Sequence, residues 1–285
     1  MEKIFVLGVG AQKTGTTWLY DWLNSQKDCN MGALKEYHVW DGKNLPVCAG
    51  YNTKKNIKIT KRLQFLAAWK FGSIHHRSDF LRTVMQHNTK NYFQYFDDIL
   101  SEPETRLTGD ITPSYIGLSE ATLSEIRTGL KERDIAPRVT LFLRDPVNRC
   151  MSAAKDKAKR TLKKGFGENE VISILSEEYK SEAFKMRTNY SCAIKNLYNV
   201  FHADEVFLCL YENLFSEETH ASLCSFLERE KDLEAIRKVV NASSGRINIP
   251  QSLAKEIAVF YSEQYESVFK IFPNAQALWP NSSLL

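Results

Sequence analysis

The chain has 285 residues, of which 43% are hydrophobic and 12% aromatic, and this composition excludes a disordered or fibrous protein. Its formal net charge of +4 is compatible with an anionic ligand but too small to indicate nucleic acid. The basic stretches also lack the interleaved aromatic residues that stack on bases, so we expect no nucleic-acid partner.

The sequence shows neither a membrane-spanning stretch nor a targeting segment. No apolar run approaches 18 residues, and the first expected strand begins near residue 3, which leaves no room for a signal peptide. We therefore expect a cytoplasmic protein without a membrane span. The six cysteines form no C-x-x-C pair and no zinc-binding spacing, so buried reduced thiols are expected.

Strands and helices alternate along the sequence. The apolar run at 3–8 predicts a strand buried on both faces of a parallel sheet, and from Thr16 onward the apolar residues follow helical spacing. Residues 42–62 are basic and poorly periodic, which indicates a loop, and the aromatic-rich residues 63–100 are expected to be helical. The further expected elements are a strand end and turn at 106–116, a strand at 138–146, a helix at 149–159, a helix at 188–201, a strand at 205–214, and helices at 217–229 and 251–271.

This alternation predicts a three-layer α/β fold, in which helices flank a mostly parallel central sheet on both faces. No internal repeat, low-complexity tract or linker interrupts the pattern. We therefore predict one domain that extends over residues 1–285.

A glycine-rich loop follows the first expected strand in "GVGAQKTGTTWL" (8–19). Gly10 and Gly15 have the spacing of a Walker A loop, G-x-x-x-x-G-K-[ST], but Thr16 stands where that loop has its lysine. The lysine is instead Lys13, inside the loop. Because a helix N-terminus presents free N–H groups and a positive dipole end, the order strand, loop, helix predicts an anion site.

A second polar feature, Arg144-Asp145, follows the apolar strand expected at 138–146. An arginine at the end of a strand indicates a fixed cation for a phosphate. Asp145 is an alternative ligand for magnesium, although Pro146 beside it favours a turn or a helix start. On balance we expect no metal.

The stretch "QKTGTTWL" (12–19) resembles the 5′-phosphosulfate loop of sulfotransferases that use 3′-phosphoadenosine 5′-phosphosulfate (PAPS). "LFLRDPVNRCMSAAKDK" (141–157) resembles the segment with which that family holds the 3′-phosphate, and this implies that Arg144 and Ser152 do so here. "NYSCAIKNLYNVF" resembles the family's G-x-Y helix, and "SSGRINIP" (243–250) its late K-G-R loop. By this resemblance the residues that bind PAPS would be Gln12, Lys13, Thr14, Gly15, Thr16, Thr17, Trp18, Arg144, Ser152, Tyr190, Ser244, Gly245 and Arg246.

The stretch "LKEYHVWD" (34–41) resembles the K-E-x-H-F-F-D segment of sulfotransferases that act on heparan-type glycans. The resemblance implies that Glu36 is the catalytic base. It also implies that His38, Lys35 and Asp41 arrange the acceptor or the base. "GDITPSYI" (109–116) resembles the family's K-T/S-P-x-Y segment, which places Pro113 and Tyr115 at the acceptor cleft, although Asp110 or Ile111 replaces the family's lysine.

The resemblance implies direct, metal-independent transfer of a sulfuryl group to a hydroxyl or amine, with Lys13 at the leaving oxygen. The acceptor would be a glycan or a small molecule, and an anionic one if the basic segment 155–164 steers it. Residues 42–105 match nothing in the family, which leaves the acceptor open. A P-loop kinase of a small metabolite and a non-catalytic nucleotide-binding relative are the alternatives.

Overall fold

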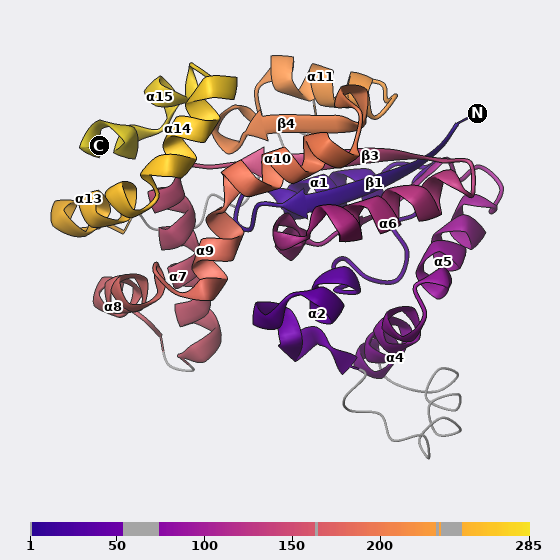
Figure 1. The fold of residues 1–285 in the computed structure, drawn as a ribbon, viewed down its shortest axis with the longest axis horizontal. Coiled ribbons are helices and arrows are strands. Elements are labelled where there is room, and N and C mark those ends of the chain that lie inside the picture. Colours follow the sequence, from indigo (N-terminus) through magenta and orange to yellow (C-terminus); the bar gives the residue numbers. More distant parts are fainter. Residues whose placement is uncertain (1, 54–73, 163–164, 232–233, 235–246) are drawn as a thin grey trace.

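The computed structural model of the protein describes residues 2–53, 74–162, 165–231, 234 and 247–285. Within these ranges the centre of the fold is a parallel sheet of four strands in the order β2-β1-β3-β4 (Figure 1). The strands are β1 (Lys3–Gly10), β2 (Leu107–Ile111), β3 (Ile135–Leu143) and β4 (Val206–Leu210). The predicted α/β fold with a parallel central sheet is confirmed.

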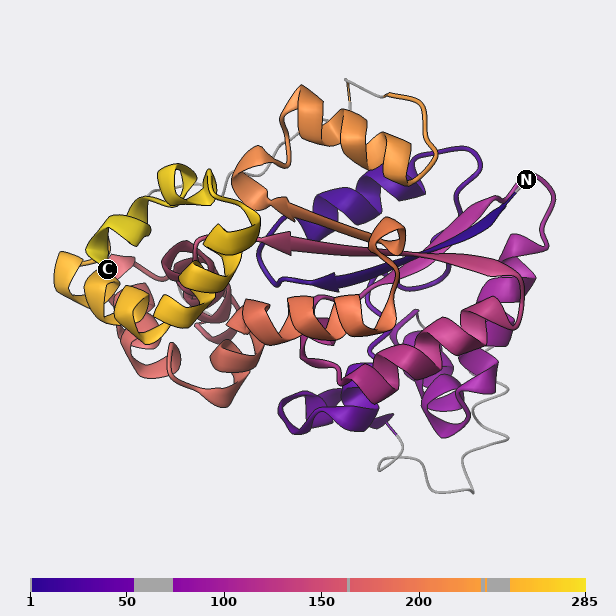
Figure 2. The same cartoon turned by 45° about the horizontal axis from the view of Figure 1, so that its top comes forward.

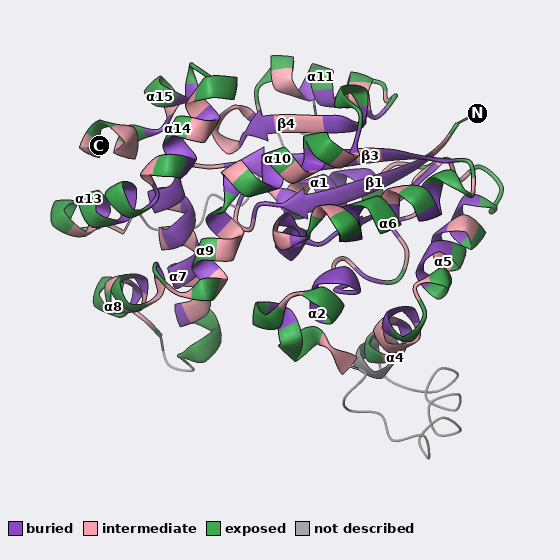
Figure 3. Ribbon diagram, viewed as in Figure 1, coloured by how far each residue is buried: buried purple, intermediate pink, exposed green. Residues whose placement is uncertain are grey.

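Helices cover both faces of the sheet (Figure 2). On one face α1 (Thr16–Asn24) and α11 (Glu217–Phe226) pack against the side chains of Ile4 and Val6. On the other face α6 (Glu120–Lys131) and α10 (Tyr190–Val200) join the core that contains Phe5 and Leu7. Successive residues of a strand point to opposite faces, so β1, buried on both faces from Ile4 onward, is apolar after Lys3. Figure 3 shows the buried residues concentrated on the strands.

The remaining elements surround this core. Before β2 lie α2 (Trp40–Asn44), η1 (Pro46–Tyr51), α4 (Ile74–His87) and α5 (Lys90–Leu100). After β2 come η4 (Pro113–Gly117), α7 (Pro146–Thr161), α8 (Glu168–Glu178), α9 (Glu182–Thr188), η5 (Ala203–Glu205) and η6 (Tyr211–Asn213). The chain ends with α13 (Gln251–Phe260), α14 (Ser262–Ile271), α15 (Ala275–Leu278) and η7 (Pro280–Leu284).

Several predicted elements have different bounds in the structure. The strand expected at 205–214 ends at Leu210, where a 3₁₀ turn takes over, and the helix expected at 251–271 divides at Tyr261. Part of the helix expected at 63–100 lies outside the described residues, and the rest forms α4 and α5. The loop expected at 42–62 begins with the end of α2 and with η1.

Several described helices, α6, α8, α9 and α15 among them, have no counterpart among the predicted elements. For α6 the signal was present, because Ser119 caps its first turn by accepting a hydrogen bond from the Thr122 N–H. Leu123, Ile126 and Leu130 then recur at the spacing of one buried helix face.

The structure bears on the expectations about the cysteines and about a membrane span. Four of the six cysteines are buried, Cys29 is half-buried, Cys192 is exposed, and none of the six forms a disulfide. None of the helices in the described part of the chain has the length and hydropathy that a membrane crossing requires.

The topology brings the motif residues to one edge of the sheet. Because all the strands are parallel, the carboxyl ends of β1, β2 and β3 meet at the same edge, beside α7 (Figure 1). The loop after β1, the segment after β2 and Arg144 after β3 therefore converge. Crevices at the carboxyl ends of parallel strands are where α/β proteins bind ligands.

Candidate active site

The glycine-rich loop connects β1 to α1 in the expected order. Gly15, the residue that precedes α1, has a φ of 89°, and a Cβ atom there would lie 2.6 Å from Cδ2 of Leu214. Glycine is therefore required by both the backbone conformation and the space. Gly15 also provides no side-chain cap, so the first N–H groups of α1 have no capping side chain and are suited to an anion.

The loop is fastened to the neighbouring strand end. The Thr14 hydroxyl is buried and donates a 2.6 Å hydrogen bond to the carbonyl of Ala11. The Arg144 guanidinium donates a 3.0 Å hydrogen bond to the carbonyl of Lys13, whose φ is 71°. The two motifs that the sequence separates by more than a hundred residues thus form one structure.

The amine of Lys13 points to α7. Its Nζ lies 3.6 Å from Oδ1 of Asp156, one helical turn after Ser152, and both side chains are about one-third exposed. Asp156 also pairs with Arg160, at 3.2 Å. Lys13 therefore faces the side of α7 that carries Ser152 and Asp156, and no motif in the sequence marked the Asp156 carboxylate.

Arg144 is held so that part of its guanidinium has no protein partner. Its Cζ lies 4.5 Å from the ring centre of Tyr211, and its carbonyl accepts a 2.9 Å hydrogen bond from the buried Tyr190 hydroxyl. Its Nε is buried without a hydrogen-bond partner, and a buried N–H of this kind is costly unless a ligand accepts from it. The residues present therefore fit a phosphate at Arg144.

Asp145 has a structural role at the start of α7. Its side chain is fully buried and accepts hydrogen bonds from the N–H groups of Val147 and Asn148, which confirms the helix-start interpretation. The hydroxyl of Tyr265 and the backbone and side-chain amides of Asn281 donate to the same carboxylate. These five donors occupy both oxygens, which leaves Asp145 unsuited to magnesium.

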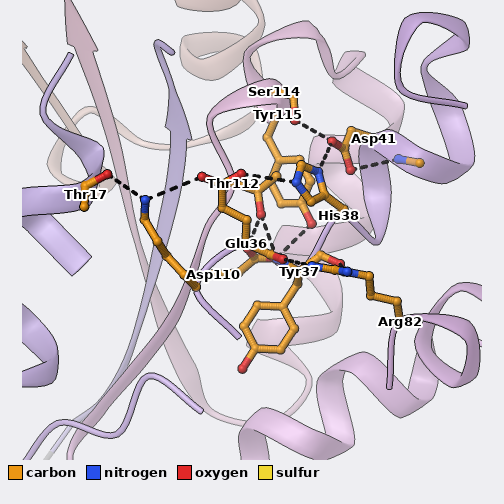
Figure 4. Close-up of polar contacts among 12 residues, drawn as sticks. Thr17, Glu36, Tyr37, His38, Asp41, Arg82, Asp110, Thr112, Ser114 and Tyr115 are labelled. Atoms are coloured by element: carbon orange, nitrogen blue, oxygen red, sulfur yellow. Dashed lines mark hydrogen bonds and ion pairs between the residues drawn. The ribbon is translucent and has the colours of Figure 1, made fainter. Parts of the chain in front are cut away.

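The segment 34–41 lies directly against the glycine-rich loop (Figure 4). Lys35 Nζ donates a 2.6 Å hydrogen bond to the hydroxyl of Thr17 in the first turn of α1. The same amine lies 3.6 Å from Oε1 of Glu36. Lys35 therefore connects the loop expected to bind phosphate with the carboxylate expected to act as base.

Glu36, His38 and Asp41 form a continuous chain of hydrogen bonds (Figure 4). His38 Nε2 lies 3.2 Å from Oε2 of Glu36, and its Nδ1 lies 2.7 Å from Oδ2 of Asp41. The exposed fraction falls from 34% for the Glu36 side chain to 6% for His38 and 0% for Asp41. Of the three side chains, Glu36 alone is thus accessible to a second substrate, and His38 and Asp41 are buried.

Asp41 and His38 are fixed by further contacts. The Ser114 hydroxyl and the Gly42 N–H donate to Asp41, and the His38 ring stacks on Tyr51 at 3.6 Å between ring centres. The Gln86 side chain donates a 2.8 Å hydrogen bond to the carbonyl of His38. The orientation of the imidazole is therefore determined from several sides.

The three groups set one another's charge. Burial alone lowers the pKa of His38, but the hydrogen bonds and charges of Asp41 and Glu36 outweigh it and raise that pKa to about 9. Burial alone raises the pKa of Asp41 and of Glu36. The hydrogen bond and charge of His38, joined at Glu36 by Lys35, outweigh burial and hold both values below the usual range. At neutral pH, His38 is therefore an imidazolium that lies between the carboxylates of Glu36 and Asp41.

A buried carboxylate near the carboxyl end of β2 supports the segment 34–41. Asp110 accepts hydrogen bonds from the hydroxyls of Thr112 and Tyr115, at 2.6 and 2.8 Å. Thr112 in turn accepts from the N–H of Tyr37, and Tyr115 from that of Val39. Burial raises the pKa of Asp110 to about 6, in spite of the hydrogen bonds that it accepts.

Arg82 of α4 completes this support. Its guanidinium donates hydrogen bonds to the carbonyls of Glu36 and Tyr37, at 2.9 and 3.1 Å (Figure 4). Because these bonds fix the backbone that directly follows the Glu36 Cα, Arg82 helps to hold the residue from which that carboxylate projects. No motif in the sequence marked Arg82, since α4 lies in the part that resembles no known segment.

The other predicted residues have varied surroundings. Tyr115 and Asp41 are buried and bond to protein groups, and Pro113 begins η4, its carbonyl close to Gly10. Trp18 stacks on Trp22 at 5.6 Å. Three predicted residues lie outside the described part of the chain: Ser244, Gly245 and Arg246.

Comparison with known proteins adds the fold family. No family model and no curated protein matches the sequence. Among solved structures, a sulfotransferase from Alicyclobacillus acidocaldarius aligns with 95% of this chain and 96% of its own, at 16% identity and a TM-score of 0.59. The chain has the fold of a sulfotransferase. A sulfotransferase domain from the Curacin biosynthetic pathway aligns with 92% of this chain and 97% of its own, at 14% identity and a TM-score of 0.47.

Proposed function

We propose that the protein is a PAPS-dependent sulfotransferase, which transfers a sulfuryl group to a hydroxyl or amine of an acceptor. The observation that supports this most is the contact of Lys35 with both Thr17 and Glu36. It joins a loop suited to phosphate to an accessible carboxylate suited to act as base. A site that only binds a nucleotide has no need of an accessible carboxylate such as Glu36.

The donor substrate would be held at the edge of the sheet. The first N–H groups of α1 would bind its 5′-phosphate, because Gly15 leaves them without a cap. Arg144, whose Nε lacks a protein partner, and Ser152 on α7 would bind its 3′-phosphate. Lys13 would leave Asp156 to meet the negative charge that develops on the leaving oxygen.

The chemical step is a direct displacement at sulfur. The acceptor's oxygen or nitrogen forms a bond to sulfur while the bond between sulfur and the 5′-phosphate oxygen breaks. The electron pair of that bond leaves on the phosphate oxygen, and Glu36 takes the acceptor's proton. The products are the sulfated acceptor and adenosine 3′,5′-bisphosphate.

His38 and Asp41 would act through Glu36. The imidazolium orients the Glu36 carboxylate and keeps it ionised, so that it is ready to accept a proton at neutral pH. Asp41, fully buried, holds the imidazole in place from the other side. We assign Asp41 and Tyr115 a positioning role, since neither side chain is exposed to an acceptor.

The acceptor class rests on the resemblance of segment 34–41 to glycan-modifying enzymes, and we propose a carbohydrate acceptor on that ground. The basic segment 155–164 lends less weight to an anionic acceptor than its composition suggests. Lys157 pairs with Glu178 at 2.6 Å, and Arg160 pairs with Asp156 at 3.2 Å. Part of its positive charge is therefore balanced within the protein.

Calorimetry with two nucleotides separates the proposal from a P-loop kinase. We expect adenosine 3′,5′-bisphosphate to bind without metal, and Mg-ATP to bind weakly, because the carboxylate of Asp145 is fully occupied. Tight Mg-ATP binding with no binding of the bisphosphate would favour the kinase. An acceptor screen with PAPS over glycans, glycolipids, phenols and alkyl alcohols then separates an enzyme from a non-catalytic relative.

A further inference from the structure

Two lysines lie at the phosphate loop, and the structure gives them different surroundings. The Lys13 amine is engaged by Asp156 on α7, at 3.6 Å. The Lys35 amine lies between the Thr17 hydroxyl, at 2.6 Å, and the Glu36 carboxylate, at 3.6 Å. We infer that Lys35 is a catalytic residue, whose ammonium group contacts the sulfuryl group while it is transferred. This inference rests on the proposed function.

The position of Lys35 follows from the geometry that in-line transfer requires. The sulfur must pass between the oxygen of the 5′-phosphate and the acceptor atom beside the base. In the proposed site the phosphate lies at the first turn of α1, where Thr17 is, and the base is Glu36. A cation that contacts Thr17 on one side and Glu36 on the other therefore lies beside the path of the sulfuryl group.

The neighbouring segments offer little competition for this role. The segment 109–116, expected on the acceptor side, contains neither lysine nor arginine. Arg82, which bonds to the Glu36 segment, donates to the carbonyls of Glu36 and Tyr37 instead. The Lys35 side chain is 34% exposed, so its amine is accessible to a ligand.

The chemistry suits an ammonium group that keeps its proton. When PAPS binds, the Lys35 amine exchanges the Thr17 hydroxyl for oxygens of the sulfuryl group, and the Thr17 hydroxyl, which only accepts from Lys35, donates its own proton to the 5′-phosphate. As the bond from sulfur to the leaving oxygen lengthens, the Lys35 ammonium stabilises the negative charge on the oxygens of the sulfuryl group. Its charge also helps to keep Glu36 ionised, since it contributes to the lowered pKa of that carboxyl.

A pair of ligands that differ only in the sulfuryl group tests the inference. PAPS carries that group and adenosine 3′,5′-bisphosphate lacks it, so a residue that touches the group changes the affinity of the first ligand alone. We expect Lys35→Met to weaken PAPS binding about 10-fold, the loss of one charge-assisted contact, and to leave bisphosphate binding unchanged. Lys35→Arg should restore part of the PAPS affinity, which also shows that the site is folded.

The controls make each outcome informative. Lys27→Met, an exposed lysine after α1, should leave both affinities unchanged. Equal losses for both ligands in Lys35→Met would make Lys35 a phosphate contact and overturn the inference. Unchanged affinities for both would confine Lys35 to the acceptor and overturn it as well. If the unsubstituted protein binds neither ligand, the proposed function itself fails and the inference with it.

Discussion

The imidazolium of His38 gives the protein a stability that depends on pH. The folded-state pKa of His38 is about 9, and its ordinary value is 6.5. Because the folded value is the higher one, protonated His38 stabilises the fold fully below about pH 6.5, and this contribution is lost as the pH rises to about 9. Replacing His38 by glutamine, which carries no charge at any pH, removes the effect.

The size of the effect follows from the two pKa values. A tenfold change in proton affinity corresponds to about 1.4 kcal/mol, so a pKa moved from 6.5 to about 9 contributes about 3 kcal/mol to the free energy of unfolding. The side chain is only 6% exposed, so solvent screens the interaction little. The lowered pKa values of Glu36 and Asp41 arise mainly from the same protonated His38, so they express the same interaction and are not added to this figure.

Urea unfolding at pH 6.5 and pH 9.5 measures the effect directly. The protein should lose about 3 kcal/mol more than His38→Gln between these two pH values. Buried thiols such as Cys48, whose pKa burial raises to about 11, also reduce stability at high pH, but they do so equally in both proteins. Equal losses in the two proteins would refute the charged state of His38 and the double ion pair that explains it.

Three further substitutions test the proposed site. Glu36→Gln should lower kcat at least about 100-fold, as expected for a lost general base, with bisphosphate affinity unchanged by calorimetry; a fully active variant would remove Glu36 from the mechanism. Arg144→Met should weaken bisphosphate binding about 10- to 100-fold, because a charge-assisted contact is lost, and unaltered binding would contradict the phosphate site. Asp156→Asn should tighten bisphosphate binding a few-fold, since it frees Lys13 and removes a negative charge; weaker binding would mean that Asp156 positions Lys13 instead.

The parts of the site that sequence predicted are those fixed by local conformation and by parallel topology. Gly15 is needed for a left-handed residue before α1, and this requirement is visible as a glycine at a fixed spacing. Arg144 follows an apolar strand, and the carboxyl ends of parallel strands meet at one edge. Its contact with Lys13 was therefore implicit in the order of elements.

The parts that sequence did not predict depend on contacts between distant segments. Asp110 lies on a buried strand, and nothing local reveals that its hydrogen bonds support Tyr37 and Val39 through Thr112 and Tyr115. Arg82 reaches the Glu36 carbonyl across 46 positions of the sequence.

Asp156 shows the same limit on α7. Within the helix it reads as a solvated charge that pairs with Arg160 four residues later. Only the tertiary structure reveals that its other oxygen lies next to Lys13 of the glycine-rich loop. Electrostatic partners from different elements are invisible to local patterns, and Asp156 is such a partner of Lys13.

Transfer of labelled sulfate from PAPS tests the central proposal most directly. We expect the protein, in the presence of a metal chelator, to label an acceptor from one class of the screen and to release adenosine 3′,5′-bisphosphate in equal amount. Glu36→Gln should bind PAPS and transfer no label above background. Phosphate transfer from Mg-ATP without any sulfate transfer from PAPS would contradict the proposal, and so would full transfer by Glu36→Gln.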